Sequence, residues 1–398
     1  MENSSDRWLE IDIDAIKHNL EQVNSLLEEK VRLIAIIKAD AYGHGAVETA
    51  RILYQNGVDF FGVSFLEEAI TLRRAGIRAS IMLFSPLINE QQVTEALTNY
   101  ITITITSLYD CTLLDKISRR LNIKTTVHLK VDTGLGRFGL NHDEIIEVCQ
   151  TLKDNPCIYI EGIYTHMAEA ASHNPAYTQK QFSRFLNIID ELKEAGHTIP
   201  VCHCANSAVF LKYPEMHLQA VRIGTLISGE LPAGKFINRL DLINPYKYKS
   251  RVISLRTLDK GSYLGYDRTI RLNQQAQIAV IPVGYNHGLA LQVANRPNGW
   301  GDFLKVLTKN ILSFFQLSRF ALKVKINDCE YPVRGKVFMQ MTLVEIPVEA
   351  KVKIGDEVEV PIRKTLAARK LNRIYIKDGE PCKIEEQEKI TYIVEEDS

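Results

Sequence analysis

The chain has 398 residues, 45% of them hydrophobic, and its 48 lysines and arginines balance its 48 aspartates and glutamates. This length favours two domains, or one large barrel with an addition. Zero net charge gives no support for nucleic acid or an anionic membrane as partner, and no apolar run approaches the length of a membrane span.

From about residue 10 to 240, short apolar runs alternate with helical patterns. Residues 15–29 show helical apolar spacing, with Asp14 as the predicted cap, and residues 177–195 carry an apolar stripe on one helix face. Strands that alternate with helices pair in parallel. The apolar runs predict eight strands, at residues 32–37, 59–65, 80–84, 100–105, 125–132, 158–166, 200–205 and 219–224.

Eight such strand–helix units are the count of a (β/α)8 TIM barrel, which we predict for residues 11–240 in preference to a doubly wound open sheet. After about residue 245, short β-rich runs separated by turns replace the helical patterns. They predict a mostly β domain over residues 241–398, with residues 1–10 packing against it. The pattern does not assign residues 290–320. The predicted strands of this domain lie at residues 251–258, 276–285, 321–327, 341–348, 356–362 and 373–377.

The seven cysteines are odd in number and match no zinc-binding spacing. Cys202, His203 and Cys204 alternate along a predicted strand, so their side chains face opposite sides and do not converge on a metal. Free thiols and a polar, acidic N-terminal stretch without signal-peptide features predict a cytoplasmic protein that binds no metal.

Polar residues follow five predicted barrel strands at their carboxyl ends, where such barrels place their chemistry. One such residue is more often a satisfied polar group at a barrel rim, but five strands that carry them together favour a site. The residues, in strand order, are Lys38, then Asp132 with Arg137, then His166, then Asn206 with Ser207, and finally Arg222 with Gly224.

A lysine at the end of an apolar strand is suited to forming a Schiff base, because desolvation lowers its pKa and leaves part of the amine neutral. An aldehyde cofactor that carries a phosphate would also need a phosphate cradle. Ser207, Gly224 and Thr225 stand at the usual phosphate position of these barrels. Glycine lets the backbone approach closely there, and a helix start supplies N–H donors.

Six segments resemble the signatures of alanine racemase, a fold type III family that uses pyridoxal 5′-phosphate (PLP). They occur in the family's order and are IIKADAYGHG, LKVDTGLGRFG, YTHMAEA, HCANSA, VRIG and IPVGY. The resemblance covers most of the chain to about residue 289 and continues weakly afterwards. It implies a homodimer whose active site lies where one barrel meets the partner's β domain, and a role in supplying D-alanine for peptidoglycan.

The resemblance implies roles toward the cofactor for several barrel residues. Lys38 matches the lysine that binds PLP. Arg222 matches the arginine that faces the pyridine nitrogen, and His166 the histidine beside the second base. The phosphate contacts are matched by Tyr42, Ser207, Gly224 and Thr225.

Other matched residues concern the substrate. Arg137 matches the arginine near the cofactor's phenolic oxygen and the substrate carboxylate, and Lys130 matches a lysine that is often carbamylated and orients that arginine. Tyr285 matches a tyrosine at the substrate entry, and Met339 a contact from the partner subunit.

Racemisation needs a base on each face of the substrate α-carbon. The resemblance implies Lys38 for one face and a tyrosine of the partner subunit for the other. Alignment on Gly261 selects Tyr266, with Tyr263 as the lesser choice. Because tyrosine is a poor base at its usual pKa of about 10, we expect the cation Arg137 and a network of other barrel side chains, His166 and Arg222, to favour its phenolate.

The chain departs from the family pattern in its second domain. Asn286 and His287 replace the middle residues of the family's GYADG, and Gln340 replaces an aspartate after Met339. Arg369 falls where the family has a tyrosine that holds the phosphate, and a guanidinium can bind phosphate as well.

The leading hypothesis is therefore a PLP-dependent amino-acid racemase that interconverts L- and D-alanine. A racemase for another amino acid, or for a broader range, is a second reading. A PLP-dependent decarboxylase is a third, although decarboxylases of this plan usually face the pyridine nitrogen with a carboxylate. The last is a non-catalytic PLP-binding protein, although such proteins lack a large second domain.

Overall fold

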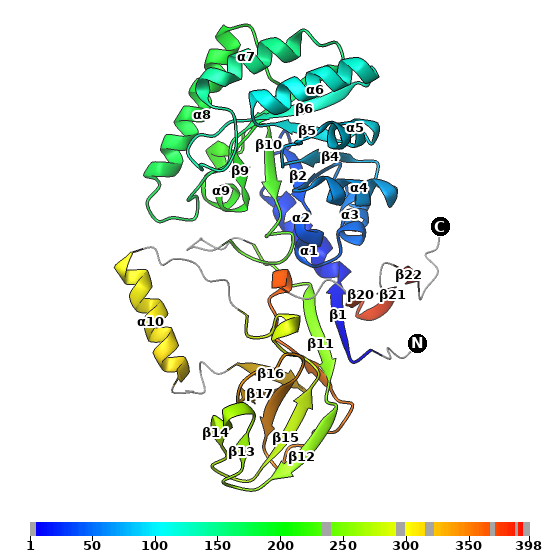
Figure 1. Ribbon diagram of the computed structural model, residues 1–398, viewed down its shortest axis with the longest axis vertical. Helices are drawn as coiled ribbons and strands as arrows, with labels where there is room; N and C mark the ends of the chain where they lie inside the picture. Colours follow the sequence, from blue (N-terminus) through cyan, green and yellow to red (C-terminus); the bar gives the residue numbers. More distant parts are fainter. Residues whose placement is uncertain are drawn as a thin grey trace. The chain divides into compact units, whose positions relative to one another are not determined.

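A computed structural model describes residues 5–232, 240–291, 299–314, 322–366, 371–386 and 389–392 (Figure 1). The chain divides into two compact units. One, the barrel unit, is Ile13–Pro245. The other, the β unit, joins Met1–Asp12 to Tyr246–Ser398.

The barrel unit is built on a nine-stranded sheet in which every pair of neighbouring strands is parallel. Each predicted barrel strand contains an observed one, because apolar β-branched runs pair well when both faces of a sheet are covered. The predicted parallel barrel is confirmed. Its strands are β2 (Arg32–Ile36), β3 (Phe60–Val63), β4 (Ser80–Leu83), β5 (Thr102–Ile105), β6 (Thr125–Lys130), β7 (Ile158–Tyr164), β8 (Val201–His203), β9 (Ala205–Asn206) and β10 (Ala220–Ile223).

One extended run nearly closes this sheet into a barrel. β8 and β9 are separated by Cys204 alone, and they lie at opposite ends of the strand order. β8 pairs with β7, whereas β9 pairs with β10. The run 201–206 therefore belongs to both edges of the sheet, and the predicted seventh strand is divided between two neighbours.

Helices follow the strands and cover the outside of the sheet (Figure 1). Side-chain caps begin several of them, for example Ser107 with Asp110 at α6 and Asn141 with Glu144 at α7. Asp14 lies in the first turn of α1 instead of capping it, because this helix begins at Ile13. The helices are α1 (Ile13–Ser25), α2 (Lys38–Tyr42), α3 (Ala46–Gln55), α4 (Leu66–Arg74), α5 (Glu90–Thr98), α6 (Leu108–Leu121), α7 (His142–Lys153), α8 (Ala176–Glu194), α9 (Ser207–Lys212) and the 3-10 turn η1 (Pro214–Met216).

The β unit is organised around an eleven-stranded sheet. The N-terminal strand lies within this sheet, antiparallel to β11 and parallel to β20. A mostly β second domain is thereby confirmed. Its strands are β1 (Arg7–Asp12), β11 (Tyr246–Arg251), β12 (Ser254–Leu258), β15 (Ala276–Ile281), β16 (Lys323–Ile326), β17 (Cys329–Arg334), β18 (Thr342–Ile346), β19 (Glu357–Glu359), β20 (Asn372–Lys377), β21 (Glu380–Glu386) and β22 (Lys389–Tyr392).

Three short features complete the β unit outside that sheet. A hairpin joins β13 (Tyr263–Leu264) to β14 (Ile270–Arg271). The 3-10 turns are η2 (Tyr266–Arg268), η3 (Tyr285–His287) and η4 (Lys364–Leu366). The hairpin and the first two turns carry the tyrosines that the sequence singles out.

The stretch 290–320, which the sequence pattern does not assign, contains helix α10 (Trp300–Phe314). Its residues 300, 303, 304, 307 and 311 are large, apolar and exposed, and they recur at helical spacing. Residues 292–298 and 315–321 lie outside the described ranges. Within those ranges, no helix is both long and apolar enough to cross a membrane.

Candidate functional site

One end of the barrel holds a cavity of about 530 Å³. It lies at the carboxyl ends of the strands, as expected for a parallel barrel. The predicted residues that line it are Lys38, Tyr42, Lys130, Arg137, His166, Ser207, Arg222, Gly224 and Thr225. Asn206 lines it as well, whereas Asp132, which the sequence also singled out, is not among the lining residues.

Lys38 enters the cavity from a strained turn. The four residues after it, 39–42, have φ between 50° and 58°, the left-handed region that L-residues rarely adopt. Such strain clusters at functional sites because the surrounding structure must impose it. Burial and the Arg137 cation lower the pKa of Lys38 below its ordinary value, while Glu68 acts in the opposite direction.

Two carboxylates hold this turn in place. Asp40 accepts the backbone N–H of Ala46 at 2.7 Å, which ties the turn to the start of α3. Glu68 accepts the N–H of Ala39 at 2.6 Å with one oxygen, and the N–H groups of Ser64 and Phe65, at 2.8 and 3.0 Å, with the other. Glu68 therefore joins the end of β3 to the turn that carries Lys38, a role that the sequence analysis missed.

A polar cradle follows β9 and β10. The Gly224 N–H lies 3.4 Å from Ser207 Oγ. The Thr225 hydroxyl is buried and has no hydrogen-bond partner among the described residues. A β-carbon at position 224 would lie 2.8 Å from the Tyr42 ring, so only glycine fits there. Burial raises the pKa of Tyr42 to about 12, which keeps its phenol protonated.

The start of α9 contributes less to this cradle than the sequence suggested. Asn206 caps the helix, and its side-chain oxygen accepts the N–H groups of Ala208 and Val209, both at 3.0 Å. Those two donors are therefore already engaged. The expectation that the start of this helix supplies free N–H donors is therefore wrong for Ala208 and Val209.

Arg222 is buried beside the cavity and is held by several acceptors. Its Nη1 lies 2.7 Å from His203 Nδ1, and its Nη2 donates to the carbonyl of Thr165 at 2.8 Å. Its Nε–H has no hydrogen-bond partner among the described residues. Burial lowers the pKa of His166 to about 3, and the neighbouring Arg222 cation is the second cause of this shift. His166 is thus neutral, and the positive charge here belongs to arginine.

Lys130 and Arg137 form a second cationic group at the cavity. The Nζ of Lys130 lies 3.5 Å from the centre of the Phe138 ring. Burial and the nearby Arg137 lower the pKa of Lys130 to about 7, so part of this amine is uncharged at neutral pH. Asp132 shapes the loop by accepting the N–H groups of residues 134, 135 and 136.

Sequence reasoning missed several residues that line the cavity. Tyr164 is buried, and its ring stacks on His203 with centroids 4.9 Å apart and planes 13° apart. Phe138 supplies the ring beneath Lys130. The period-two alternation of a strand could have placed Tyr164 on the inner face of β7, but its stacking partner is distant in sequence and leaves no local signal.

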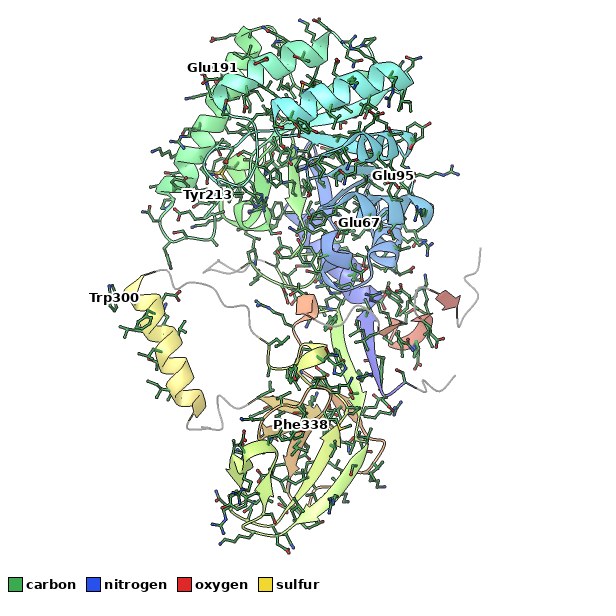
Figure 2. All side chains as sticks on the ribbon, viewed as in Figure 1. Glu67, Glu95, Glu191, Tyr213, Trp300 and Phe338 are labelled. Atoms are coloured by element: carbon green, nitrogen blue, oxygen red, sulfur yellow. The ribbon has the colours of Figure 1, made fainter. Side chains whose placement is uncertain are left out.

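Tyr266 and Met339, expected from the partner subunit, and Tyr285, expected at the substrate entry, gather around Phe338 in the β unit. The Tyr266 ring meets the Phe338 ring edge-on, with centroids 5.1 Å apart, and the Tyr285 N–H donates to the Phe338 carbonyl at 3.0 Å. Met339 follows Phe338, which Figure 2 labels among the side chains of this unit. Tyr266 is 71% exposed and Met339 57%. Both therefore present free side chains.

The departures from the family pattern also lie in the β unit. His287 Nδ1 faces the N–H of Gly284 at 3.1 Å, and its Nε2 lies 2.5 Å from Arg7 Nη1. His287 thus occupies a structural contact with the N-terminal strand. Gln340 is exposed. Arg369 lies outside the described residues.

The fold and the cavity define a parallel-barrel protein that holds a lysine with a lowered pKa beyond a strand end. Comparison with known proteins gives the family. The model "Alanine racemase, N-terminal domain" matches residues 11–232, and "Alanine racemase, C-terminal domain" matches residues 246–374. The chain therefore belongs to the alanine racemase family, as the sequence motifs indicated, and is an isomerase of that family.

Individual relatives agree with this assignment. Alanine racemase 1 of Oceanobacillus iheyensis is 35% identical over 293 residues, which are 73% of this chain and 77% of that protein. The alanine racemase of Methanococcus maripaludis is 32% identical over 355 residues, 89% of this chain and 88% of its own.

Solved structures show the same fold. The alanine racemase of Clostridium difficile 630 has a TM-score of 0.85 and 28% identity, and the match covers 97% of this chain and 100% of that one. The histidine racemase of Leuconostoc mesenteroides subsp. sake NBRC 102480 has a TM-score of 0.79 at 21% identity, covering 94% and 99%. At that identity, the likeness concerns the fold alone.

Proposed function

We propose that the protein is a PLP-dependent racemase of amino acids, with alanine as its substrate, and that it acts as a homodimer. The observation that carries this proposal is the joint presence, in one cavity, of an amine with a lowered pKa and a cradle with an unpaired hydroxyl. Lys38 provides the first and Thr225 the second.

The residues present fit the cofactor. Lys38 would bind its aldehyde carbon through Nζ. The phosphate would receive hydrogen bonds from the orphaned Thr225 hydroxyl and its neighbours Ser207 and Tyr42. The Nε–H of Arg222 remains available to donate to a pyridine nitrogen. When bound, PLP supplies an electron sink for negative charge on the substrate α-carbon.

The chain's own residues would then move the proton. Lys38, whose pKa is lowered by burial and by the Arg137 cation, would accept or return a proton on one face of the α-carbon. The same amine cannot reach the opposite face. We assign that face to the Tyr266 hydroxyl of a second copy, because this side chain is exposed in its own unit.

Arg137 and Lys130 would orient the substrate. Arg137 lines the cavity with a guanidinium suited to a carboxylate. Lys130 is partly uncharged at neutral pH, and a neutral amine can react with carbon dioxide to give a carbamate. We include that modification in the proposal because an anion there would hold the Arg137 cation in position.

Arg222 favours racemisation over decarboxylation. It has only donors and stays charged, so a pyridine nitrogen that faces it must accept a hydrogen bond and remain unprotonated. Such a ring is a weaker electron sink than a protonated one. When bound, such a ring would supply only modest stabilisation of negative charge at the substrate α-carbon, which favours proton exchange there.

The activity assay mixes the purified protein with PLP and L-alanine and follows optical rotation and carbon dioxide together. We expect rotation to fall to zero without gas release, and the same end point from D-alanine. Gas release would show a decarboxylase. Bound cofactor without either change would show a carrier, and a parallel panel of other L-amino acids identifies a different substrate.

A complementation experiment addresses the shared site. Lys38→Ala and Tyr266→Phe proteins are each expected to be nearly inactive, because each lacks one base. In a homodimer with shared sites, mixing them by co-expression creates one intact site per heterodimer. Random pairing should then restore about a quarter of wild-type activity. Mixtures no more active than their parents would contradict the shared site.

A further inference from the structure

A row of buried polar side chains runs through the barrel interior, from Arg222 beside the cavity toward the other end of the strands. Arg222 Nη1 lies 2.7 Å from His203 Nδ1, and His203 Nε2 lies 3.0 Å from His128 Nδ1. His128 Nε2 in turn lies 3.0 Å from Glu161 Oε2. Both histidine side chains are fully buried, so this row is isolated from water for most of its length.

The chemistry of the terminal groups sets the direction of every hydrogen bond in the row. An arginine only donates, so His203 Nδ1 must accept and its proton must sit on Nε2. That proton is donated to His128 Nδ1, which places the proton of His128 on Nε2, where it is donated to the Glu161 carboxylate. Burial lowers the pKa of both histidines, in agreement with two neutral rings.

The far end of the row reaches the opposite face of the barrel. Glu161 is 24% exposed, and its Oε1 lies 3.6 Å from Nη1 of Arg32, the first residue of β2. Arg32 also pairs with the exposed carboxylate of Asp59, at 3.1 Å. The row therefore begins at the amino ends of the strands and ends at the cavity, which lies at their carboxyl ends.

The backbone is shaped to admit the middle of the row. A β-carbon at Gly162, next to Glu161, would lie 2.8 Å from His128 Cγ, so a larger residue would displace the ring. The pairing of β6 with β7 shifts register between Val127 and His128. On the cavity side, the Tyr164 ring stacks on His203 and restrains its plane.

We propose that Glu161 is a positioning residue that acts through His128 and His203 to fix the orientation of Arg222. Its carboxylate accepts the proton of His128 Nε2 and so stabilises, from the other end of the row, the proton positions that Arg222 requires, which keeps an acceptor aimed at the guanidinium. The link from Arg222 to catalysis rests on the proposed PLP function. The selection of the proton positions does not.

The first test reads the proton positions directly. Histidine labelled with ¹⁵N in the full-length protein with PLP reports, by nuclear magnetic resonance, which ring nitrogen carries the proton. We expect neutral rings protonated on Nε2 for His128 and His203 in the wild type. Glu161→Ala should change the signals of both, whereas Glu161→Gln keeps an acceptor oxygen and should preserve them. A His203 ring protonated on Nδ1 in the wild type, or signals unchanged in Glu161→Ala, would overturn the proposal.

The second test separates positioning from stability. Glu161→Ala should lower kcat about ten-fold with KM changed less than two-fold, and Glu161→Gln should restore most of the loss. Asp59→Asn is the matched control, because it removes the other partner of Arg32 but leaves the row intact, and it should keep wild-type kcat. Equal losses in Glu161→Ala and Asp59→Asn would overturn the positioning role. A wild type that binds no PLP would refute the proposed function instead, and the ring signals would still test the row.

Discussion

The barrel unit and the β unit differ in where they place their polar residues. In the barrel unit, cationic and hydroxyl side chains from distant strands turn inward and line one cavity. In the β unit, the side chains of Tyr266 and Met339 are exposed. The first unit gathers polar side chains around a cavity, whereas the second exposes its tyrosine and methionine side chains.

The electrostatics of the two places differ as well. Lys38, Lys130, Arg137 and Arg222 bring four basic side chains to the barrel cavity, and the pKa of both lysines is lowered. A cavity with such an excess of cations is suited to an anionic ligand. The corresponding place in the β unit combines aromatic and thioether side chains. The two places thus differ both in the exposure of their side chains and in their charge.

The largest expected effect comes from replacing the lysine in the barrel cavity. Lys38→Ala should lower racemisation at least about 10³-fold, because it removes both the covalent anchor and one base. The visible absorption of protein-bound PLP should disappear from the purified protein. The matched control is Lys124→Ala, an exposed lysine on the same unit. Retention of that absorption in Lys38→Ala would mean that another residue holds the cofactor.

The second-largest effect is expected from replacing a tyrosine of the β unit. Tyr266→Phe should lower racemisation by about 10²–10³-fold while leaving the absorption of bound PLP in place, because it removes only a proton-transfer group. Tyr263→Phe, which alters the neighbouring exposed tyrosine, should stay within two-fold of wild type. Reversed results for the two variants would make Tyr263 the second base.

A smaller effect concerns the buried charge at Lys130. The folded protein loses this proton as the pH rises through about 7, whereas the unfolded chain keeps it to about 10.5. The unfolded state therefore binds more protons between these values, and stability rises with pH across the window. Lys130→Met should melt roughly 2–4 °C above wild type at pH 6, with a gap that narrows toward pH 9.

The measurement for this variant is a thermal melt at several pH values in buffer free of bicarbonate, so that no carbamate forms. Lys124→Met, which replaces an exposed lysine, serves as the control and should show no pH-dependent gap. A gap for Lys130→Met that is the same at every pH would be incompatible with the lowered pKa.

The smallest effect concerns the strained turn. Ala39 is exposed with φ of 52°, a conformation that glycine adopts freely. Ala39→Gly should change the free energy of unfolding by less than about 1 kcal/mol, because relief of strain offsets the greater entropy of the unfolded chain. Lys180→Gly, at an exposed position inside the right-handed helix α8, should destabilise by about 0.5–1 kcal/mol. Denaturant titration gives the free energy of unfolding of both variants. Equal losses of this free energy would show that the turn at Ala39 is not strained.

The barrel was the more predictable unit, because its signals are local. Apolar runs such as residues 60–63 predict a strand buried on both faces, and motif residues such as Lys38 and His166 closely follow strand ends. Contacts between distant segments left no such signal. The bond from Glu68 to Ala39 and the row from Glu161 to Arg222 depend on tertiary packing that periodicity does not encode.

The β unit was harder to predict because several of its strands are polar or interrupted. β17 contains Pro332, and β21 alternates charged residues with few apolar ones. β11 did carry a usable signal, since its tyrosines alternate with lysines along Tyr246–Arg251 and its burial alternates in step. Helix α10 shows helical apolar spacing, but its apolar side is exposed. A rule that places every apolar residue in the core therefore fails for this helix.

The left-handed turn after Lys38 has a consequence for when the protein becomes chemically competent. Four non-glycine residues in that conformation oppose folding by roughly 4–8 kcal/mol. The turn therefore forms only once α3 and α4 have supplied the acceptors and donors that hold it. A nascent chain carries at this position an ordinary, solvated and protonated lysine. The lowered pKa of Lys38 is thus a product of assembly, and local fraying of this corner would return the amine to its solvated, protonated state.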